Sequence, residues 1–412
     1  MPKYTVTKRH HCRLCGSQNP TRFLSFNSIP FFDEVVAHND RGNEFSYPME
    51  LYFCNNCSSV QTQHDINLQE YYHNYQYVAS HSRFIQKYMR SLVDYCQESL
   101  GLGQGDYVIE VGAADGYLLD LFNQRGLRTL GFEAAKNLCQ LASDKKLNVI
   151  NALFTKETID LIPKEFQSAH LVVLLHTFDH LYDPSNFLEA VREVIDPKRG
   201  VFLIEVHDLQ DIYDKHETAL FGHEHATYLH YSSLKRFLNR HGFRIVDFNF
   251  LPKAECRGSS MLVAAALEGS ELIAAPNLSS FANAKLDQLP TFLQFEADVL
   301  DAFAKLRKHI ECGKNSGRRF AGYGGWGRGV TTLAMAGLGK DHLEFVVDGN
   351  CALHGGYTPV SDLRIVGPDA VSKENIDEVI VFNYAYIHEI RDTLSDYIAS
   401  GGEVVSVIDL LS

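Results

Sequence analysis

The sequence predicts an α/β protein in which a small cysteine-bearing module precedes two Rossmann-like units. Apolar runs of strand length alternate with helical stretches from 107 to 265, which is the order of a doubly wound parallel sheet. The alternation restarts at 318 in a second, smaller unit. Two Cys-x-x-Cys pairs lie within 10–60. The expected domains are residues 1–65, 66–268, and 269–412, the last with a helical connector before its Rossmann-like part.

The bulk composition is that of a soluble globular protein. The 412 residues suggest two or three domains, with 45% hydrophobic and 22% charged residues. The net charge of −13 argues against nucleic acid as a partner. The opening "MPKYTVTKRHHC" has no apolar stretch, and runs such as "LVVLL" are too short to span a bilayer. We expect a cytoplasmic monomer or small homo-oligomer with no membrane partner.

The paired cysteines predict a structural zinc site. They are Cys12, Cys15, Cys54 and Cys57. Two Cys-x-x-Cys turns supply four soft ligands for a closed tetrahedral Zn²⁺ site, and Gly16 permits the tight backbone of the first turn. In a chain without an export signal this spacing favours metal over disulfides or four ordinary core cysteines. His10 and His11 are possible substitute ligands, although solvated loop histidines are the simpler interpretation.

The remaining elements follow in order. The stretch between the cysteine pairs, with Pro30 and Pro48, is loop-like, and residues 66–100 are expected to be helical. The first unit has the runs "YVIEVG", "TLGFEA", "LNVINA", "LVVLLH", "VFLIEV", "RIVDFNFL" and "SSMLVAAAL". A helical connector is expected over 276–316. The second unit has "RRFAGYG", "LEFVVDG", "EVIVFNYAY" and "EVVSVIDLL".

The first glycine turn predicts a nucleoside cofactor. Glu110, Gly112 and Gly116 form E-x-G-x-x-x-G, which is similar to the turn for S-adenosylmethionine (SAM) in Rossmann-type methyltransferases. Gly112 lets the backbone lie against the cofactor, and Glu110 or Asp115 can meet its ammonium group. Glu133, after the next strand, can accept both ribose hydroxyls. A nicotinamide-binding turn or an empty α/β turn remains the alternative.

A second glycine turn raises the question of a second nucleotide. Gly322, Gly324 and Gly327 are spaced as G-x-G-x-x-G, and Asp348 ends the next apolar run. This is the outline of a dinucleotide-binding turn. Taken alone, it leaves a nucleotide-dependent oxidoreductase open.

Seven stretches carry a family resemblance that runs nearly end to end, besides the paired cysteines. They are "YQYVASHS" (75–82), "VIEVGAADGYLL", "GFEAAKNL", "HTFDHLYDP" (176–184), "HEHATYLHYSSL" (223–234), "GYGGWGRGVT" and "FVVDGNCALHGGYTP". The chain resembles the three-domain sugar C-methyltransferases of deoxysugar pathways. The resemblance implies a zinc-binding domain, a SAM-binding Rossmann domain and a Rossmann-like C-terminal domain that faces the sugar nucleotide without binding a dinucleotide.

The implied reaction is methyl transfer from SAM to carbon 3 of a nucleotide-linked 4-keto sugar. A base removes the acidic C–H beside the ketone, and the resulting enolate attacks the methyl group. Three alternatives stay open. They are the same fold acting on another carbon, oxygen or nitrogen, an NAD-dependent oxidoreductase, and a non-catalytic binder of sugar nucleotides.

The resemblance also implies site residues. His225 is the expected base, with Glu224 beside it, and His180 is expected to orient or polarise the sugar. Further expected contacts to the cofactor are Tyr77, Ser80 and His176. Expected substrate contacts are Tyr228, Tyr323, Trp326 and Arg328. A metal site is the alternative for the His-Glu-His block, since His223 and His225 would face the same way on a strand.

Several positions depart from the family pattern. Gly222 stands where a tyrosine usually precedes His-Glu-His, and His176 replaces an asparagine. The stretch "CRGSSML" replaces a His-Gly-Gly-Ser-like segment. Trp326 and Arg328 stand where small residues and a lysine are usual. The acceptor-facing motifs are therefore more altered than the cofactor-facing ones.

Overall fold

The computed structural model describes residues 4–31, 34–67 and 78–411, and it divides into two compact units. The first unit comprises Met1–Pro20, Phe53–Gln210 and His225–Gln288. The second comprises Thr21–Tyr52, Asp211–Glu224 and Leu289–Ser412. The domain boundaries expected after residues 65 and 268 stay a prediction.

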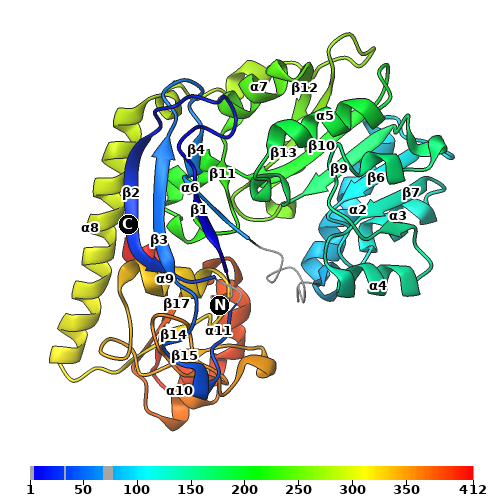
Figure 1. The fold of residues 1–412 in the computed structure, drawn as a ribbon. Coiled ribbons are helices and arrows are strands. Elements are labelled where there is room, and N and C mark those ends of the chain that lie inside the picture. The colour runs from blue at the N-terminus through cyan, green and yellow to red at the C-terminus, as the bar shows by residue number, and fades with distance from the viewer. Residues whose placement is uncertain (1–3, 32–33, 68–77, 412) are drawn as a thin grey trace. The chain divides into compact units, whose positions relative to one another are not determined.

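A seven-stranded sheet forms the centre of the first unit, in the order β12-β13-β10-β9-β6-β7-β8 (Figure 1). Its strands are β6 (Tyr107–Val111), β7 (Arg128–Phe132), β8 (Val149–Ile150), β9 (Leu171–Leu175), β10 (Val201–His207), β12 (Phe243–Phe248) and β13 (Ser260–Leu267). Strands β6 to β10 pair in parallel, whereas β13 is antiparallel to both β10 and β12. The strand order reverses between β6 and β9, and such sheets bind ligands beyond the carboxyl ends of their strands at this point.

Helices accompany the strands of this sheet, as the alternating pattern predicts. They are α2 (Arg83–Glu98), α3 (Tyr117–Gln124), α4 (Lys136–Asp144), α5 (Pro184–Val194) and α7 (Tyr231–Arg240). Helix α6 (Leu209–Lys215) begins in the first unit, but most of its residues belong to the second. Successive side chains of a strand point to opposite faces. Val172 and Leu174 of β9 accordingly join one hydrophobic core, and Leu171 and Val173 join the other. Each fully buried side chain of this size contributes roughly 1.5–3 kcal/mol, so both faces of the sheet stabilise the unit.

The N-terminal part of the first unit is a small β-structure around the paired cysteines. Strand β1 (Val6–Lys8) pairs antiparallel with β5 (His64–Ile66), and β4 (Val60–Thr62) pairs antiparallel with β11 (Thr227–Tyr228).

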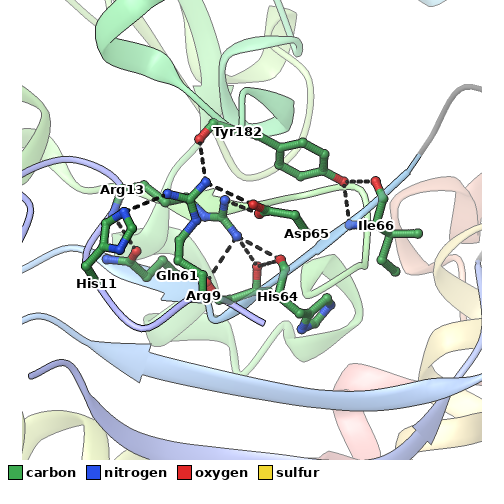
Figure 2. A network of polar contacts seen from close by, with 9 residues as sticks. Arg9, His11, Arg13, Gln61, His64, Asp65, Ile66 and Tyr182 are labelled. Carbon is green, nitrogen blue, oxygen red and sulfur yellow. Dashed lines mark hydrogen bonds and ion pairs between the residues drawn. The ribbon is translucent and has the colours of Figure 1, made fainter. Parts of the chain in front are cut away.

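A polar network ties this part to the loop after β9, as Figure 2 shows. Arg9 and Arg13 both ion-pair with the carboxylate of Asp65. The hydroxyl of Tyr182 donates to the carbonyl of Ile66 at 2.8 Å and accepts its N–H at 3.2 Å. The side chain of Arg13 is fully buried, so its charge depends on this pairing.

A five-stranded parallel sheet forms the centre of the second unit, in the order β16-β15-β14-β17-β18. Its strands are β14 (Phe320–Tyr323), β15 (Val346–Val347), β16 (Ile365–Val366), β17 (Glu378–Val381) and β18 (Glu403–Ser406). Its helices are α8 (Leu289–Asn315), α9 (Arg328–Ala336), α10 (Ala370–Lys373), α11 (Ile387–Thr393), α12 (Ser395–Ala399) and α13 (Val407–Leu411). The second Rossmann-like unit is confirmed as a parallel α/β sheet.

Two expectations for regular structure were wrong in detail. The stretch between the cysteine pairs contains two strands, β2 (Thr21–Ile29) and β3 (Tyr47–Phe53), rather than a loop. Aromatic side chains of β2 pack on α8, with ring centroids of Phe23 and Phe292 5.1 Å apart. The connector is α-helical only from Leu289 onward and begins with two short 3-10 helices, η8 (Leu278–Phe281) and η9 (Ala284–Asp287). No helix within the described ranges is long and apolar enough to cross a membrane.

Candidate active site

The turn after β6 forms a cradle at the carboxyl edge of the first sheet. Gly112 and Gly116 have positive φ angles of 74° and 76°, a region that side chains with a Cβ rarely adopt. A Cβ at Gly112 would lie 2.6 Å from Oγ1 of Thr177, and one at Gly116 would lie 2.4 Å from Cδ1 of Leu147. Both glycines are therefore required by the backbone and by the close packing of the turn.

Two buried carboxylates follow the strand ends here. Oxygens of Glu133 accept the N–H groups of Ala114 at 2.8 Å and Ala135 at 2.7 Å, which fixes the carboxylate at the end of β7. Burial nevertheless raises the pKa of Glu133 above its ordinary value. Glu110 is 3% exposed, and burial raises its pKa well above the ordinary value. Its Oε2 atom has no hydrogen-bond partner in the described part of the chain.

The residues of this edge fit SAM. Gly112 and Gly116 allow the tight turn after β6, and Glu110 and Glu133 beside it offer carboxylate oxygens for an ammonium group and ribose hydroxyls. Asp115 already ion-pairs with Lys145 at 2.8 Å and accepts the N–H of Ser80 at 3.4 Å. Burial would raise the pKa of Asp115, but these donors lower it below its ordinary value.

The predicted cofactor residues are only partly brought together. Tyr77 lies outside the described residues. Ser80 lies in the short helix η2 (Ala79–His81), next to the turn through its contact with Asp115. His176 follows β9 directly with a positive φ of 48°. Its Nε2 lies 3.0 Å from Oγ of Ser260 and 3.2 Å from Oε1 of Glu205.

A cluster of histidines surrounds Asp179, which is in helix η5 (Phe178–His180) and fully buried. Oδ2 of Asp179 lies 2.5 Å from Nδ1 of His207, and Oδ1 lies 3.8 Å from Nε2 of His180. The ring centroid of His225 is 4.9 Å from that of His180 and 4.6 Å from that of His207. The ring centroids of His176 and His207 are also 4.6 Å apart. The structure therefore joins His180 and His225, which were predicted as catalytic, to His176, which was predicted as a cofactor contact.

Burial sets the charges in this cluster. It lowers the pKa of both His180 and His207 to about 3, so both rings are neutral near pH 7. Burial alone would raise the pKa of Asp179, but the facing histidines, His207 above all, hold it well below its ordinary value. A charged carboxylate is thus surrounded by neutral imidazoles, which can accept protons or ligate a cation.

Sequence reasoning missed several members of this site. They are Tyr88, Asp179, Glu205, His207, Arg257 and Ser260. The signal available was position, because Glu205 and His207 lie at the carboxyl end of β10. Ser260 begins β13 opposite His207, since β13 runs antiparallel to β10. Nε of Arg257 lies 3.5 Å from Oε2 of Glu205 and, together with His176 and Tyr88, offsets the effect of burial, so that the pKa of Glu205 falls to about 2.

The His-Glu-His block is not the predicted strand. Residues 223–225 form a turn, and β11 begins only at Thr227. His223 belongs to the second unit, where its Nε2 lies 2.8 Å from the carbonyl oxygen of Ile29. Burial lowers its pKa to about 4. The strand argument for a metal site at His223, Glu224 and His225 was therefore wrong.

Glu224, which precedes His225, and Tyr228, three positions after it, are both buried. Tyr228, a predicted substrate residue, is fully buried in β11, and its ring centroid is 6.3 Å from that of His225. Glu224 is also fully buried. A Cβ at Gly222 would lie 3.0 Å from Oε2 of Glu224, so the family tyrosine at this position would have to displace that carboxylate.

The glycine turn of the second unit is closed by its own side chains. Asp348 accepts the N–H groups of Gly325 at 3.0 Å and Asn350 at 2.9 Å. Three of the four predicted substrate residues lie on or next to this turn. Tyr323 ends β14 and is buried, Trp326 is partly buried, and Arg328 starts α9 and ion-pairs with the buried Glu217.

The paired cysteines form one cluster, with all four sulfur atoms within 4.8 Å of one another. Sγ of Cys12 lies 3.6 Å from that of Cys57, and Sγ of Cys15 lies 3.5 Å from that of Cys54. Gln61 donates to Sγ of Cys12 at 3.0 Å. Four convergent sulfurs with an N–H donor fit a closed zinc site. His10 and His11 are exposed.

Three family profiles match the chain. A zinc binding domain matches residues 12–72, a methyltransferase domain 81–247, and a C-methyltransferase C-terminal domain 258–408. The C-methyltransferase NovU of Streptomyces niveus is 29% identical over 399 residues, which cover 96% of this chain and 94% of that protein.

Two solved structures are also similar to part of the chain. A SAM-dependent methyltransferase from Clostridium acetobutylicum is 12% identical and covers 45% of this chain and 92% of its own, with a TM-score of 0.36. A SAM-dependent methyltransferase from Archaeoglobus fulgidus is 16% identical and covers 45% and 93%, with a TM-score of 0.36.

The profile matches, the cofactor turn and the cysteine cluster define a SAM-dependent methyltransferase that also binds zinc. The matched domains follow one another in the order that the sequence predicts. The chain is therefore similar to C-methyltransferases along nearly its whole length, through three consecutive domain matches and one relative at 29% identity.

Proposed function

We propose that this enzyme methylates carbon 3, next to the ketone of a nucleotide-linked 4-keto deoxysugar. The observation that carries the proposal is the cluster of His180, His207 and His225 around Asp179, on the sheet edge that also holds the Gly112 turn. Bound SAM supplies a methyl group on a positively charged sulfur. The protein must then create a carbon nucleophile, which requires a base and a means of stabilising an enolate oxygen.

His225 is the proposed base. Its ring lies next to the neutral rings of His180 and His207. When His225 takes a proton from the sugar carbon, the nearby negative charge of Asp179 can stabilise the protonated ring. Glu224, which precedes it in the sequence and is fully buried, is proposed as a second catalytic residue. His180 is 16% exposed at its side chain and is proposed to orient the sugar or to donate to its ketone oxygen.

Gly112, Gly116, Glu110 and Glu133 are the proposed cofactor residues, together with Ser80 and His176. We propose that the nucleotide sugar is recognised in part through the turn of the second unit, with Trp326 stacking and Arg328 pairing with a phosphate. The pairing of Arg328 with Glu217 means that a phosphate would have to compete with a carboxylate already in place.

The test is a methylation assay with SAM and a panel of 4-keto nucleotide sugars, read by mass spectrometry as the gain of one CH₂, about 14 Da. The His225→Gln variant should lose this product while still binding SAM in calorimetry. Unchanged product formation by that variant would overturn the assignment of the base. A thermal shift with NAD(H) but none with SAM would instead favour an oxidoreductase.

A second candidate is the same enzyme acting on another acceptor, at a different carbon, an oxygen or a nitrogen. Gly222 beside the carboxylate of Glu224 favours it, because the tyrosine of the resembling family is missing at this position. A product methylated at oxygen or nitrogen, located by fragmentation in the same assay, would select this candidate.

A further inference from the structure

Three side chains of the histidine cluster, His176, Asp179 and His207, form a group whose geometry indicates a role besides those proposed above. His176 follows β9, Asp179 lies three residues further on, and His207 ends β10. One ligand atom from each of the three lies within 4.8 Å of the other two. Two imidazoles and one carboxylate in this arrangement are a known ligand set for first-row divalent metal ions with open coordination positions.

One carboxylate oxygen of Asp179 is available to bind an ion. Its Oδ2 faces His207, whereas Oδ1 has no hydrogen-bond partner in the described part of the chain. The side chain is fully buried. A buried carboxylate oxygen without a partner is costly, because it has lost its water without gaining a donor.

The surroundings of His176 are those of a metal-ligating histidine. Its Nε2 faces Oγ of Ser260 at 3.0 Å and Oε1 of Glu205 at 3.2 Å. A metal-ligating histidine usually donates its second ring N–H to a carboxylate or hydroxyl, which fixes the tautomer and leaves the other nitrogen for the ion. The carboxylate of Glu205 is itself balanced by Arg257 at 3.5 Å, so Glu205 can orient His176 while Asp179 provides the ligand charge.

The backbone at His176 supports the same interpretation. The residue has φ 48°, in the left-handed region, and its N–H donates to the carbonyl of Glu205 at 2.9 Å. A non-glycine residue in this region is strained, and such residues cluster at functional sites. The strained conformation brings the ring to His207, with ring centroids 4.6 Å apart.

We infer that His176, Asp179 and His207 bind a divalent first-row transition ion, such as Zn²⁺ or Co²⁺, at a second metal site separate from the four cysteines. The side chains of His176 and His207 are 15% and 9% exposed, so the site can be reached from solvent. An ion here would act as a Lewis acid on a ketone oxygen of the acceptor. That role depends on the proposed function, whereas the ion site itself does not.

The experiment is metal binding to the full-length protein loaded with one equivalent of Zn²⁺ at the cysteines, followed by titration with Co²⁺. We expect one further equivalent, with visible d–d absorption and no thiolate-to-cobalt charge-transfer band. His207→Gln and Asp179→Asn should each lose this equivalent and keep the first. His309→Gln is the matched control, because that histidine also faces a carboxylate, Glu378, at 2.7 Å but lies outside the cluster.

A wild-type protein that takes up no second equivalent would overturn the inference, and this measurement needs no variant to fold. A second equivalent that survives in both Asp179→Asn and His207→Gln would overturn it as well. Because no acceptor sugar is present, a negative result leaves the methylation assay unaffected, and a failed methylation assay leaves the metal titration unaffected.

Discussion

Oδ2 of Asp179 and Nδ1 of His207 lie 2.5 Å apart, although 28 positions separate the two residues in the sequence. The contact joins the loop after β9 to the end of β10, at the edge where the strand order of the sheet reverses nearby. The carboxylate of Asp179 is fully buried, so its negative charge lies among four histidine rings and out of contact with water.

Asp179→Asn should lower kcat by about 100-fold or more, because the neutral amide cannot stabilise positive charge on the neighbouring imidazoles. The dissociation constant for SAM should stay unchanged. Methyl transfer and SAM calorimetry measure the two effects. Asp247→Asn is the matched control, since Asp247 also accepts a side-chain hydrogen bond, from Tyr95 at 2.8 Å, but lies on β12. Equal losses in both variants would contradict a specific role for Asp179.

Gly112→Ala should weaken SAM binding by about tenfold or more. The new Cβ would approach Oγ1 of Thr177 to 2.6 Å at a φ of 74°, which costs of order 1–3 kcal/mol and would shift the turn against which SAM is proposed to lie. Isothermal calorimetry measures the affinity. Gly105→Ala carries similar backbone strain, with φ 87° and nothing within 4 Å of its Cβ. It should lose stability but bind SAM normally.

Cys15→Ser should abolish the zinc equivalent bound by the cysteines and expose the N-terminal segment to protease. The reason is that a closed four-sulfur site contributes folding free energy directly. Metal content and limited proteolysis report the two effects, and chelation of the wild-type protein should reproduce them. Cys312→Ser is the control, because Cys312 is exposed and lies outside the cluster. A protease-resistant segment without zinc would contradict this prediction.

His223 should make the protein less stable in acid. Burial holds its pKa at about 4, below the value of 6.5 in an unfolded chain, so the unfolded state binds the proton first. The contribution of the neutral ring to the free energy of unfolding is fully present above pH 6.5. It is lost as the pH falls toward 4, which lowers that free energy by on the order of 3 kcal/mol. His223→Gln should flatten this slope in denaturant unfolding curves. If the pH dependence of the free energy of unfolding were the same in this variant, His223 would not be a buried, neutral ring in the folded protein.

The sequence predicted the parts of the site that depend on short spacing. The turn with Gly112 and Gly116 and the paired cysteines are defined by residues only a few positions apart, so their chemistry could be predicted before the fold was known. The contact of Asp179 with His207 could not, because only the parallel pairing of β9 with β10 brings them together. The roles assigned to His225, Glu224 and the SAM contacts stay predictions.

The errors in regular structure have similar causes. Strands β2 and β3 were missed because prolines and polar residues border them, and β2 is stabilised by packing against the distant helix α8. The alternative of a metal site at the His-Glu-His block assumed a strand, but a turn begins there and His223 faces the carbonyl oxygen of Ile29. The spacing of residues along the sequence could not show whether the backbone at these positions would form a strand or a turn.

Because β13 runs antiparallel to β10, the segment 249–259 that leads into β13 arrives at the edge of the sheet where β10 ends at His207. It enters the rim just before Ser260, which faces His207 across the antiparallel ladder and holds His176. A graft confined to this segment would change Arg257 and the support of His176 while leaving the turn after β6 intact. Substitutions within 249–259 would therefore alter the surroundings of the acceptor while leaving Gly112, Gly116 and Glu133 unchanged.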